Sequence, residues 1–247
     1  MSKNKLAKFI EMKEFNHVIQ APYNTIEQDD FYLKGKWAAD FFKNEYPVIL
    51  ELGCGKGEYT VQLAEKYPEK NFIGVDIKGA RMYNGAKQAL DKELKNVAFL
   101  RTNIEIIERF FGANEIAEIW LTFPDPQMKK TRKRLTSSFF LERYRNFLKS
   151  DGIIHLKTDS NFQFTYTSAL IHANKFEIIS ETENLYESEL LNDTLKIKTF
   201  YEKQWLARGI TIKYIAFKLN EKELEEPEID IERDEYRSFG RSAKDIH

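Results

Sequence analysis

The sequence has a single cysteine, Cys54, among its 247 residues. One thiol excludes a framework of intrachain disulfides and leaves no cysteine cluster that could hold a metal ion. No apolar run approaches the roughly 20 residues that a membrane-spanning helix requires. The first residues lead into mixed polar sequence, without the apolar region of a secretory signal. We therefore expect a cytoplasmic protein with no disulfide framework and no bound metal.

The sequence also has almost no net charge, −1 in total, but its charges are unevenly distributed. Residues 221–235 contain nine acidic and two basic residues, so this segment carries −7 and the rest of the chain +6. Basic residues are densest in residues 129–134, which we call the basic cluster: Lys129, Lys130, Arg132, Lys133 and Arg134. Such a cluster usually forms a solvated surface. Its alternative role is to bind an anionic partner.

Short apolar runs rich in branched residues alternate with segments of helical periodicity. The runs expected to form strands are residues 48–52, 72–77, 97–101, 116–123, 153–157, 176–180 and 210–219. Segments between them place apolar residues on one helical face, as Met82, Ala86 and Leu90 illustrate. Asp159 or Ser160 could cap the helix that follows the fifth run. This alternation predicts parallel strands joined by right-handed crossovers, with helices on both faces of the sheet.

The last two runs break this rhythm, because no helix follows the second of them. They predict a closing hairpin with an antiparallel last strand, an ending that plain dinucleotide-binding sheets lack. We therefore expect an α/β fold of the Rossmann-like class I methyltransferase type, with a doubly wound, mostly parallel, seven-stranded sheet. Residues 31–220 would form this domain, with a helix at 37–42 laid across the sheet. Residues 1–30 would form a basic arm, mobile or ordered, and residues 221–247 an acidic extension whose lack of periodicity makes it a candidate for disorder.

A glycine-rich loop follows the first expected strand, with Gly53, Gly55 and Gly57 at alternate positions. Glycines let the backbone turn sharply and approach a ligand closely, although a tight strand-to-helix turn alone could also explain them. The spacing is not G-x-G-x-x-G, and the acid Glu51 precedes the loop. A carboxylate there would repel the pyrophosphate of a dinucleotide. S-adenosylmethionine carries an ammonium and a sulfonium and no phosphate, so the loop predicts that cofactor.

Two polar residues follow the next strands. Asp76 closes the second expected strand, where a carboxylate can accept hydrogen bonds from both ribose hydroxyls of a nucleoside. Asn103 follows the third strand, where its amide could pair with an adenine edge. Asn103 could equally cap the helix expected at residues 104–111, and the two roles are compatible.

The run Phe123-Pro124-Asp125-Pro126 ends the fourth expected strand, at the edge where an open parallel sheet places its chemistry. The two prolines stiffen the loop and remove two backbone donors. A rigid turn with a solvated aspartate is the alternative explanation. The basic cluster leaves this loop directly, so its charges would meet phosphates of a nucleic acid near the reacting base.

Four motifs together resemble the bacterial tRNA (guanine-N7-)-methyltransferase family over about residues 20–220. They are Glu51-Leu-Gly-Cys-Gly-Lys-Gly57, Phe123-Pro-Asp-Pro126 with its basic tail, Leu156-Lys-Thr-Asp159 and Thr199-Phe-Tyr-Glu202. One departure is visible: Gln127 and Met128 stand where the family usually has Trp-Pro. A tryptophan's stacking surface is therefore missing from this loop.

The resemblance implies that S-adenosylmethionine is the cofactor and that tRNA is the partner, with no obligatory protein partner. The expected product is N7-methylguanosine, at guanosine 46 of the variable loop in the family. The residues expected to contact the cofactor are Glu51, Gly53, Gly55, Gly57, Asp76, Asn103 and Asp125. Asp125 is also the expected catalytic residue. Those expected to contact the substrate are Lys129, Asp159, Thr199 and Glu202, with Lys130, Arg132, Lys133 and Arg134 placed to meet the tRNA backbone.

The chemistry of guanine N7 suits a lone aspartate. N7 carries a free lone pair and no proton, so attack on a sulfonium methyl group needs no general base, and methylation leaves the ring cationic. Our hypothesis is that Asp125 holds the guanine edge in line and stabilises the developing charge.

Three other functions compete with this one. Methyltransferases that act on exocyclic amines of RNA bases or of protein side chains typically carry Asp/Asn-Pro-Pro-Tyr/Phe, an order that Phe123-Pro-Asp-Pro-Gln127 lacks. A nicotinamide dehydrogenase is disfavoured by Glu51 and by the glycine spacing. A non-enzymatic RNA-binding module would not need the cofactor loop.

Overall fold

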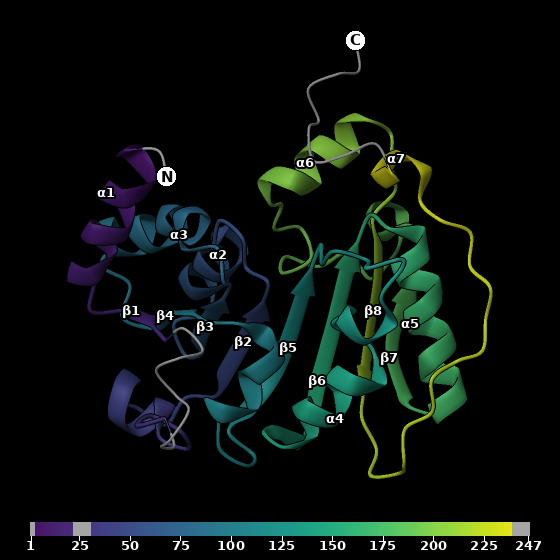
Figure 1. Cartoon of the computed structure of the whole chain (residues 1–247), viewed down its shortest axis with the longest axis horizontal. Helices are drawn as coiled ribbons and strands as arrows, with labels where there is room; N and C mark the ends of the chain where they lie inside the picture. The colour runs from purple at the N-terminus through teal and green to yellow at the C-terminus, as the bar shows by residue number, and fades with distance from the viewer. Residues whose placement is uncertain (1–2, 22–30, 239–247) are drawn as a thin grey trace.

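The computed structural model describes residues 3–21 and 31–238. Its centre is one eight-stranded sheet with the strand order β1-β4-β3-β2-β5-β6-β8-β7 (Figure 1). The strands are β1 (Val18–Gln20), β2 (Val48–Leu52), β3 (Asn71–Val75), β4 (Val97–Arg101), β5 (Ile116–Thr122), β6 (Leu148–Thr158), β7 (Glu177–Thr182) and β8 (Lys213–Lys218).

The first six strands of the chain are parallel, and β8 runs antiparallel between β6 and β7. The doubly wound sheet with an antiparallel last strand is therefore confirmed. The expected number of strands was one too low, because Val18 and Gln20 pair with Phe99 and Arg101 and add β1 at the edge. A three-residue strand is too short for its side-chain alternation to be recognised in a sequence.

Helices cover both faces of the sheet, as Figure 1 shows. The α-helices are α1 (Lys3–Glu11), α2 (Glu58–Lys66), α3 (Gly79–Asp91), α4 (Ser138–Arg145), α5 (Asn161–Asn174), α6 (Phe200–Ala207) and α7 (Glu235–Ser238). Short helical turns are η1 (Met12–Glu14), η4 (Ile104–Arg109), η5 (Thr131–Lys133) and η6 (Leu185–Glu187), and η3 (Trp37–Phe42) is a π-helix at the position expected for a helix. None of the described helices is long and apolar enough to cross a membrane.

Two apolar clusters lie on opposite faces of the sheet, as the alternation along β2 requires. Leu50 belongs to one cluster, with Tyr144 of α4 and Leu170 of α5. Ile49 belongs to the other, with residues of α2 and α3. Every residue of β2 and β3 is buried, which explains why these strands are mostly apolar in sequence. Leu90, which we expected to face inward from α3, is 44% exposed.

The regions outside the expected domain also contact the sheet layers. Within the expected arm α1 lies against α3, and η1 and β1 follow it. Residues 1–2 and 22–30 of the arm lie outside the described residues. Residues 221–234 form no regular element but run back along α5. At the C-terminal end of α5, Asn174 exchanges two hydrogen bonds of 2.8 Å with the backbone of Glu225. At its N-terminal end, Asp234 accepts a hydrogen bond from the backbone N–H of Phe162.

Candidate active site

The carboxyl ends of the central parallel strands bring most of the expected site residues to one edge of the sheet. Glu51 on β2 pairs in register with Gly74 on β3 and with Trp120 on β5. Thr122, the last residue of β5, pairs with Lys157 on β6. The residues that follow these strands therefore meet at one edge, where open α/β sheets bind their ligands.

The glycine loop needs its glycines for backbone geometry and for space. Gly53, Gly55 and Gly57 have φ angles of +82°, +56° and +72°, in the left-handed region that favours glycine. A Cβ added to Gly57 would lie 2.6 Å from the ring of Phe99. The backbone N–H of Gly55 donates to Asp76 Oδ2 at 2.9 Å, so the loop and the end of β3 are joined.

Glu51 lies beneath this loop and is only 3% exposed. One carboxylate oxygen accepts hydrogen bonds from the backbone N–H of Thr60, at 2.9 Å, and from the Thr60 hydroxyl, and the other accepts from the Thr122 hydroxyl. Burial raises the pKa of Glu51 to about 7, although the hydrogen bonds from Thr122 and Thr60 act in the opposite direction. In this position Glu51 ties β2 to α2 and β5, directly below the expected cofactor.

Asp76 and Asn103 occupy the positions expected for nucleoside contacts. Asp76 is partly exposed, and its second oxygen accepts from the backbone N–H of Lys78 at 2.7 Å. Asn103 caps η4, because its side chain accepts from the backbone N–H of Glu105 at 3.1 Å. The capping role is therefore confirmed. A carboxylate and an amide at these positions suit the hydroxyls of a ribose and the edge of an adenine.

Asp125 is exposed at the tip of a stiff loop. One carboxylate oxygen accepts from the backbone N–H of Gln127 at 3.0 Å. Phe123 and Gln127, on either side, have φ angles of +52° and +47°, which non-glycine residues rarely adopt. Backbone strain of this kind concentrates at functional sites, where the surrounding structure holds it. The loop thus presents a carboxylate at the same edge as the glycine loop.

The basic cluster divides into exposed and buried members. Lys129, Lys130, Arg132 and Lys133 are exposed. Lys133 Nζ lies 3.2 Å from Glu105, and the Arg132 guanidinium lies 4.5 Å from the centre of the Phe139 ring.

Arg134, the last member of the basic cluster, is 7% exposed. Its guanidinium lies 4.7 Å and 4.3 Å from the ring centres of Phe162 and Tyr166. It also donates a hydrogen bond to the backbone carbonyl of Met128. Arg134 therefore packs the loop onto α5, which contradicts the expectation that it faces a tRNA backbone.

Of the other residues assigned to the substrate by resemblance, Glu202 and Asp159 are buried and Thr199 is half-buried. Thr199 caps α6, and Glu202 completes a capping box with it. Glu202 is fully buried, and its carboxylate lies 2.7 Å from Lys157 Nζ. Asp159 is 1% exposed, and the Tyr236 hydroxyl lies 2.9 Å from its Oδ2.

The partners of these buried acids were not predicted from the sequence. Glu202 is bound by Lys157 and by the Tyr186 hydroxyl. Asp159 is bound by the Tyr236 hydroxyl, and Asp234 accepts a hydrogen bond from Phe162 at the start of α5. A lysine inside an apolar strand was a usable signal for a buried acid elsewhere in the chain. No comparable signal marked Asp234 or Tyr236, which lie in a segment without periodicity.

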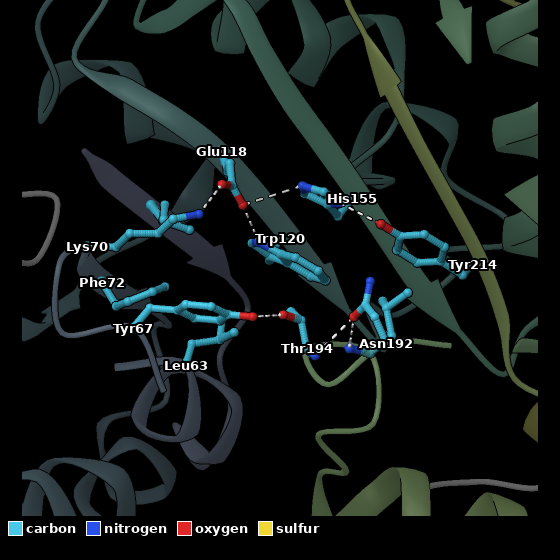
Figure 2. Close-up of a pocket in the computed structure, with 12 residues that line it drawn as sticks. Leu63, Tyr67, Lys70, Phe72, Glu118, Trp120, His155, Asn192, Thr194 and Tyr214 are labelled. Carbon is cyan, nitrogen blue, oxygen red and sulfur yellow. Dashed lines mark hydrogen bonds and ion pairs between the residues drawn. The ribbon is translucent and has the colours of Figure 1, made fainter. Parts of the chain in front are cut away.

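A cavity of about 220 Å³ lies on the face of the sheet, further back along β5 and β6 than the loop of Asp125. Figure 2 shows Glu118 between Lys70 and His155, with contacts of 3.0 Å and 3.5 Å, and Tyr214 beyond His155 at 2.8 Å. Burial opposes ionisation of Glu118, but His155 and Lys70 lower its pKa to about 2. The His155 ring stacks on Trp120 with centroids 4.0 Å apart. This network supports the sheet and shares no residue with the expected site.

The described residues contain no group of three or more His, Cys, Asp or Glu side chains that could hold a metal ion.

Comparison with known structures supports the fold. The structure resembles the 16S rRNA methyltransferase KamB with a TM-score of 0.58 and 13% identity, covering 76% of this chain and 94% of that one. It resembles an antibiotic-related methyltransferase with a TM-score of 0.54 and 17% identity, covering 74% and 92% of the two chains. At these identities the likeness establishes the class I methyltransferase fold alone.

Comparison of sequences is more specific. Residues 45–215 match a family model described as "Putative methyltransferase". A protein of Bacteroides thetaiotaomicron named tRNA (guanine-N(7)-)-methyltransferase is 60% identical over 99% of this chain and 97% of its own length. One of the same name from Porphyromonas gingivalis is 54% identical over 94% and 98% of the two chains. The chain belongs to the tRNA (guanine-N(7)-)-methyltransferase family.

Proposed function

We propose that this protein transfers a methyl group from S-adenosylmethionine to N7 of a guanine in tRNA, with guanosine 46 of the variable loop as the expected target. The observation that carries the proposal is the position of Asp125. Its carboxylate stands exposed on a stiff loop at the same sheet edge as the glycine loop and Asp76. The names of the relatives, which cover nearly the whole chain, supply the acceptor.

The residues around the glycine loop would hold the cofactor. S-adenosylmethionine would supply an electrophilic methyl group on its sulfonium. The glycines, in their left-handed conformation, would let the backbone lie against the methionine part of the cofactor. Asp76 would accept hydrogen bonds from the ribose hydroxyls. Asn103 would pair with the adenine while its side-chain oxygen continues to cap η4.

Asp125 would act on the acceptor by position and charge. Guanine N7 reacts through its lone pair, so no side chain has to remove a proton from it. The carboxylate would orient the guanine edge and stabilise the positive charge that the ring acquires. Lys129 and Lys130, which follow Asp125 closely and are exposed, would bind phosphates beside the target base.

Methylation of an exocyclic amine is the second candidate for the acceptor, and the residue order Phe123-Pro-Asp-Pro-Gln127 argues against it. Calorimetry with S-adenosylmethionine, its demethylated product and NAD tests the cofactor. We expect the first two to bind and NAD not to bind. Binding of NAD alone would contradict the proposal and favour the dehydrogenase.

A further inference from the structure

Trp205 of α6 and Tyr236 of α7 form an aromatic pair at the carboxyl edge of the sheet. Their ring centres are 5.4 Å apart, with the planes inclined at 63°. The two helices lie next to each other above the ends of β5 and β6 in Figure 1. Both residues are half-buried.

The pair is held close to the proposed reaction site. The Tyr236 hydroxyl lies 2.9 Å from Oδ2 and 3.0 Å from the backbone carbonyl oxygen of Asp159. Asp159 and Asp125 follow neighbouring strands, since Thr122 and Lys157 pair in register just before them. Two residues before Tyr236, the buried Asp234 accepts hydrogen bonds from the Ser160 hydroxyl and from the backbone N–H of Phe162. Tyr236 is therefore held through its own hydroxyl and through the residue two positions before it.

Charges of both signs surround the pair, and the one that contacts Trp205 is cationic. The exposed Arg208 guanidinium lies 5.0 Å from the centre of the Trp205 indole, and Lys203 is exposed on the same helix. The extension that carries Tyr236 is acidic, and the exposed Glu235 directly precedes Tyr236. Two of its other acids are bound by the domain: Glu226 accepts hydrogen bonds from Ser138 and Tyr166, and the buried Asp234 accepts one from the backbone N–H of Phe162.

We propose that Trp205 and Tyr236 form a stacking surface for an unpaired base of the tRNA substrate, with Asp159 holding Tyr236 in place. The inference rests on the proposed function. Proteins recognise unpaired RNA bases by stacking them on aromatic rings beside cationic side chains. The pair supplies aromatic surface at an edge where Gln127 and Met128 have replaced the tryptophan and proline common in the family. Asp159, being buried, acts as a positioning residue for Tyr236.

Tryptophan fluorescence tests this directly. The chain has three tryptophans, of which Trp37 and Trp120 are 0% and 4% exposed, so Trp205 is the one that solvent and RNA can reach. We expect an unmodified tRNA transcript to quench the emission of the full-length protein and to protect it from acrylamide. Trp205→Phe should abolish both changes. Unchanged emission and unchanged acrylamide quenching at tRNA concentrations that saturate binding in a filter assay would overturn the inference.

Substitutions of Tyr236 distinguish a residue that stacks on the tRNA from a segment that covers the site. Tyr236→Leu should raise the Kd for tRNA at least about fivefold, the effect of losing one stacked base, while the Kd for S-adenosylmethionine stays constant. Tyr236→Phe keeps the ring and should have a smaller effect. Tyr46→Leu is the matched control, because Tyr46 is 46% exposed and precedes β2 at the opposite edge. Tighter tRNA binding by Tyr236→Leu would overturn the inference, since the segment would then cover the site.

The two proposals fail separately. If tRNA protects Trp205 but the methyl group appears on another base, the stacking surface stands and the proposed acceptor falls. If N7-methylguanosine forms while Trp205 is unaffected by tRNA, the proposed function stands and the stacking surface falls.

Discussion

Lys157 and Glu202 form an ion pair of 2.7 Å in which neither side chain has any exposed surface. Lys157 Nζ also donates to the backbone carbonyls of Leu195 and Ile197, at 2.8 Å and 2.9 Å, so all three of its N–H donors have acceptors. The Tyr186 hydroxyl donates to Glu202 at 2.6 Å. The pair thereby attaches the segment before α6, and α6 itself, to the end of β6.

Removing the lysine should destabilise the protein strongly. Lys157→Met leaves the Glu202 carboxylate buried without a counter-charge, and breaking a buried pair in this way costs about 3–5 kcal/mol. The free energy of unfolding in urea measures the loss. The double variant Lys157→Met/Glu202→Gln should recover a large part of it, because no charge is then left buried. A single variant as stable as the wild type would show that the pair does not hold α6.

Glu51 should make the stability of the protein depend on pH. Its pKa is about 7 in the folded protein and near 4.5 as a free glutamate. The folded state therefore holds the proton more tightly, and the stabilisation present at low pH is lost as pH rises through this window, up to about 3 kcal/mol. Urea unfolding between pH 5 and pH 8 should show this fall for the wild type.

Glu51→Gln has no proton to lose, so its unfolding free energy should not show this fall, and the wild type should become less stable relative to the variant as pH rises. Glu69→Gln, at an exposed glutamate, is the matched control. Parallel stability curves for wild type and Glu51→Gln would contradict the position of Glu51 beneath the loop.

Asp125→Asn should lower kcat by about a hundredfold, the usual effect of removing one electrostatic contact to a transition state. The asparagine oxygen can still accept from the Gln127 N–H, so the loop should keep its shape. The Kd for S-adenosylmethionine should stay the same, and the variant should show no steep new pH dependence. A wild-type kcat that follows one carboxylate proton with unit slope, independently of binding, would instead make Asp125 a general base.

The exposed part of the basic cluster should determine the salt dependence of tRNA binding. Reversing two charges, as in Lys130→Glu/Arg132→Glu, should weaken binding and reduce the slope of log K against log salt by about 2. Lys149→Glu/Lys175→Glu is the control, because both lysines are exposed and lie at the opposite edge, at the start of β6 and the end of α5. If the slope of the first variant equals that of the control, the cluster is a solvated surface.

The sequence predicted the central sheet well because its parallel strands are buried on both faces and appear as apolar runs. Boundaries were less accurate where exposed residues belong to a strand. β6 begins at Leu148, five residues before the expected run, since Lys149, Ser150 and Asp151 are exposed there. The apolar pattern detects only the buried part of such a strand.

The site was predictable where its signal is local, as for Gly53, Gly55 and Asp76. It was not predictable where the burial of a charged side chain depends on a residue far away in the sequence. Asp159 accepts a hydrogen bond from Tyr236, 77 residues further along the chain. Arg134 reads like its neighbours in the basic cluster and differs only because the rings of Phe162 and Tyr166 enclose it.

The reaction itself gives the most direct test of the proposed function. The protein would be incubated with total unmodified tRNA and S-adenosylmethionine carrying an isotopic label in its methyl group, and the digested nucleosides analysed by mass spectrometry. The proposal predicts that the label appears in N7-methylguanosine and that Asp125→Asn yields far less of it. Label on an exocyclic amine of any base would contradict it.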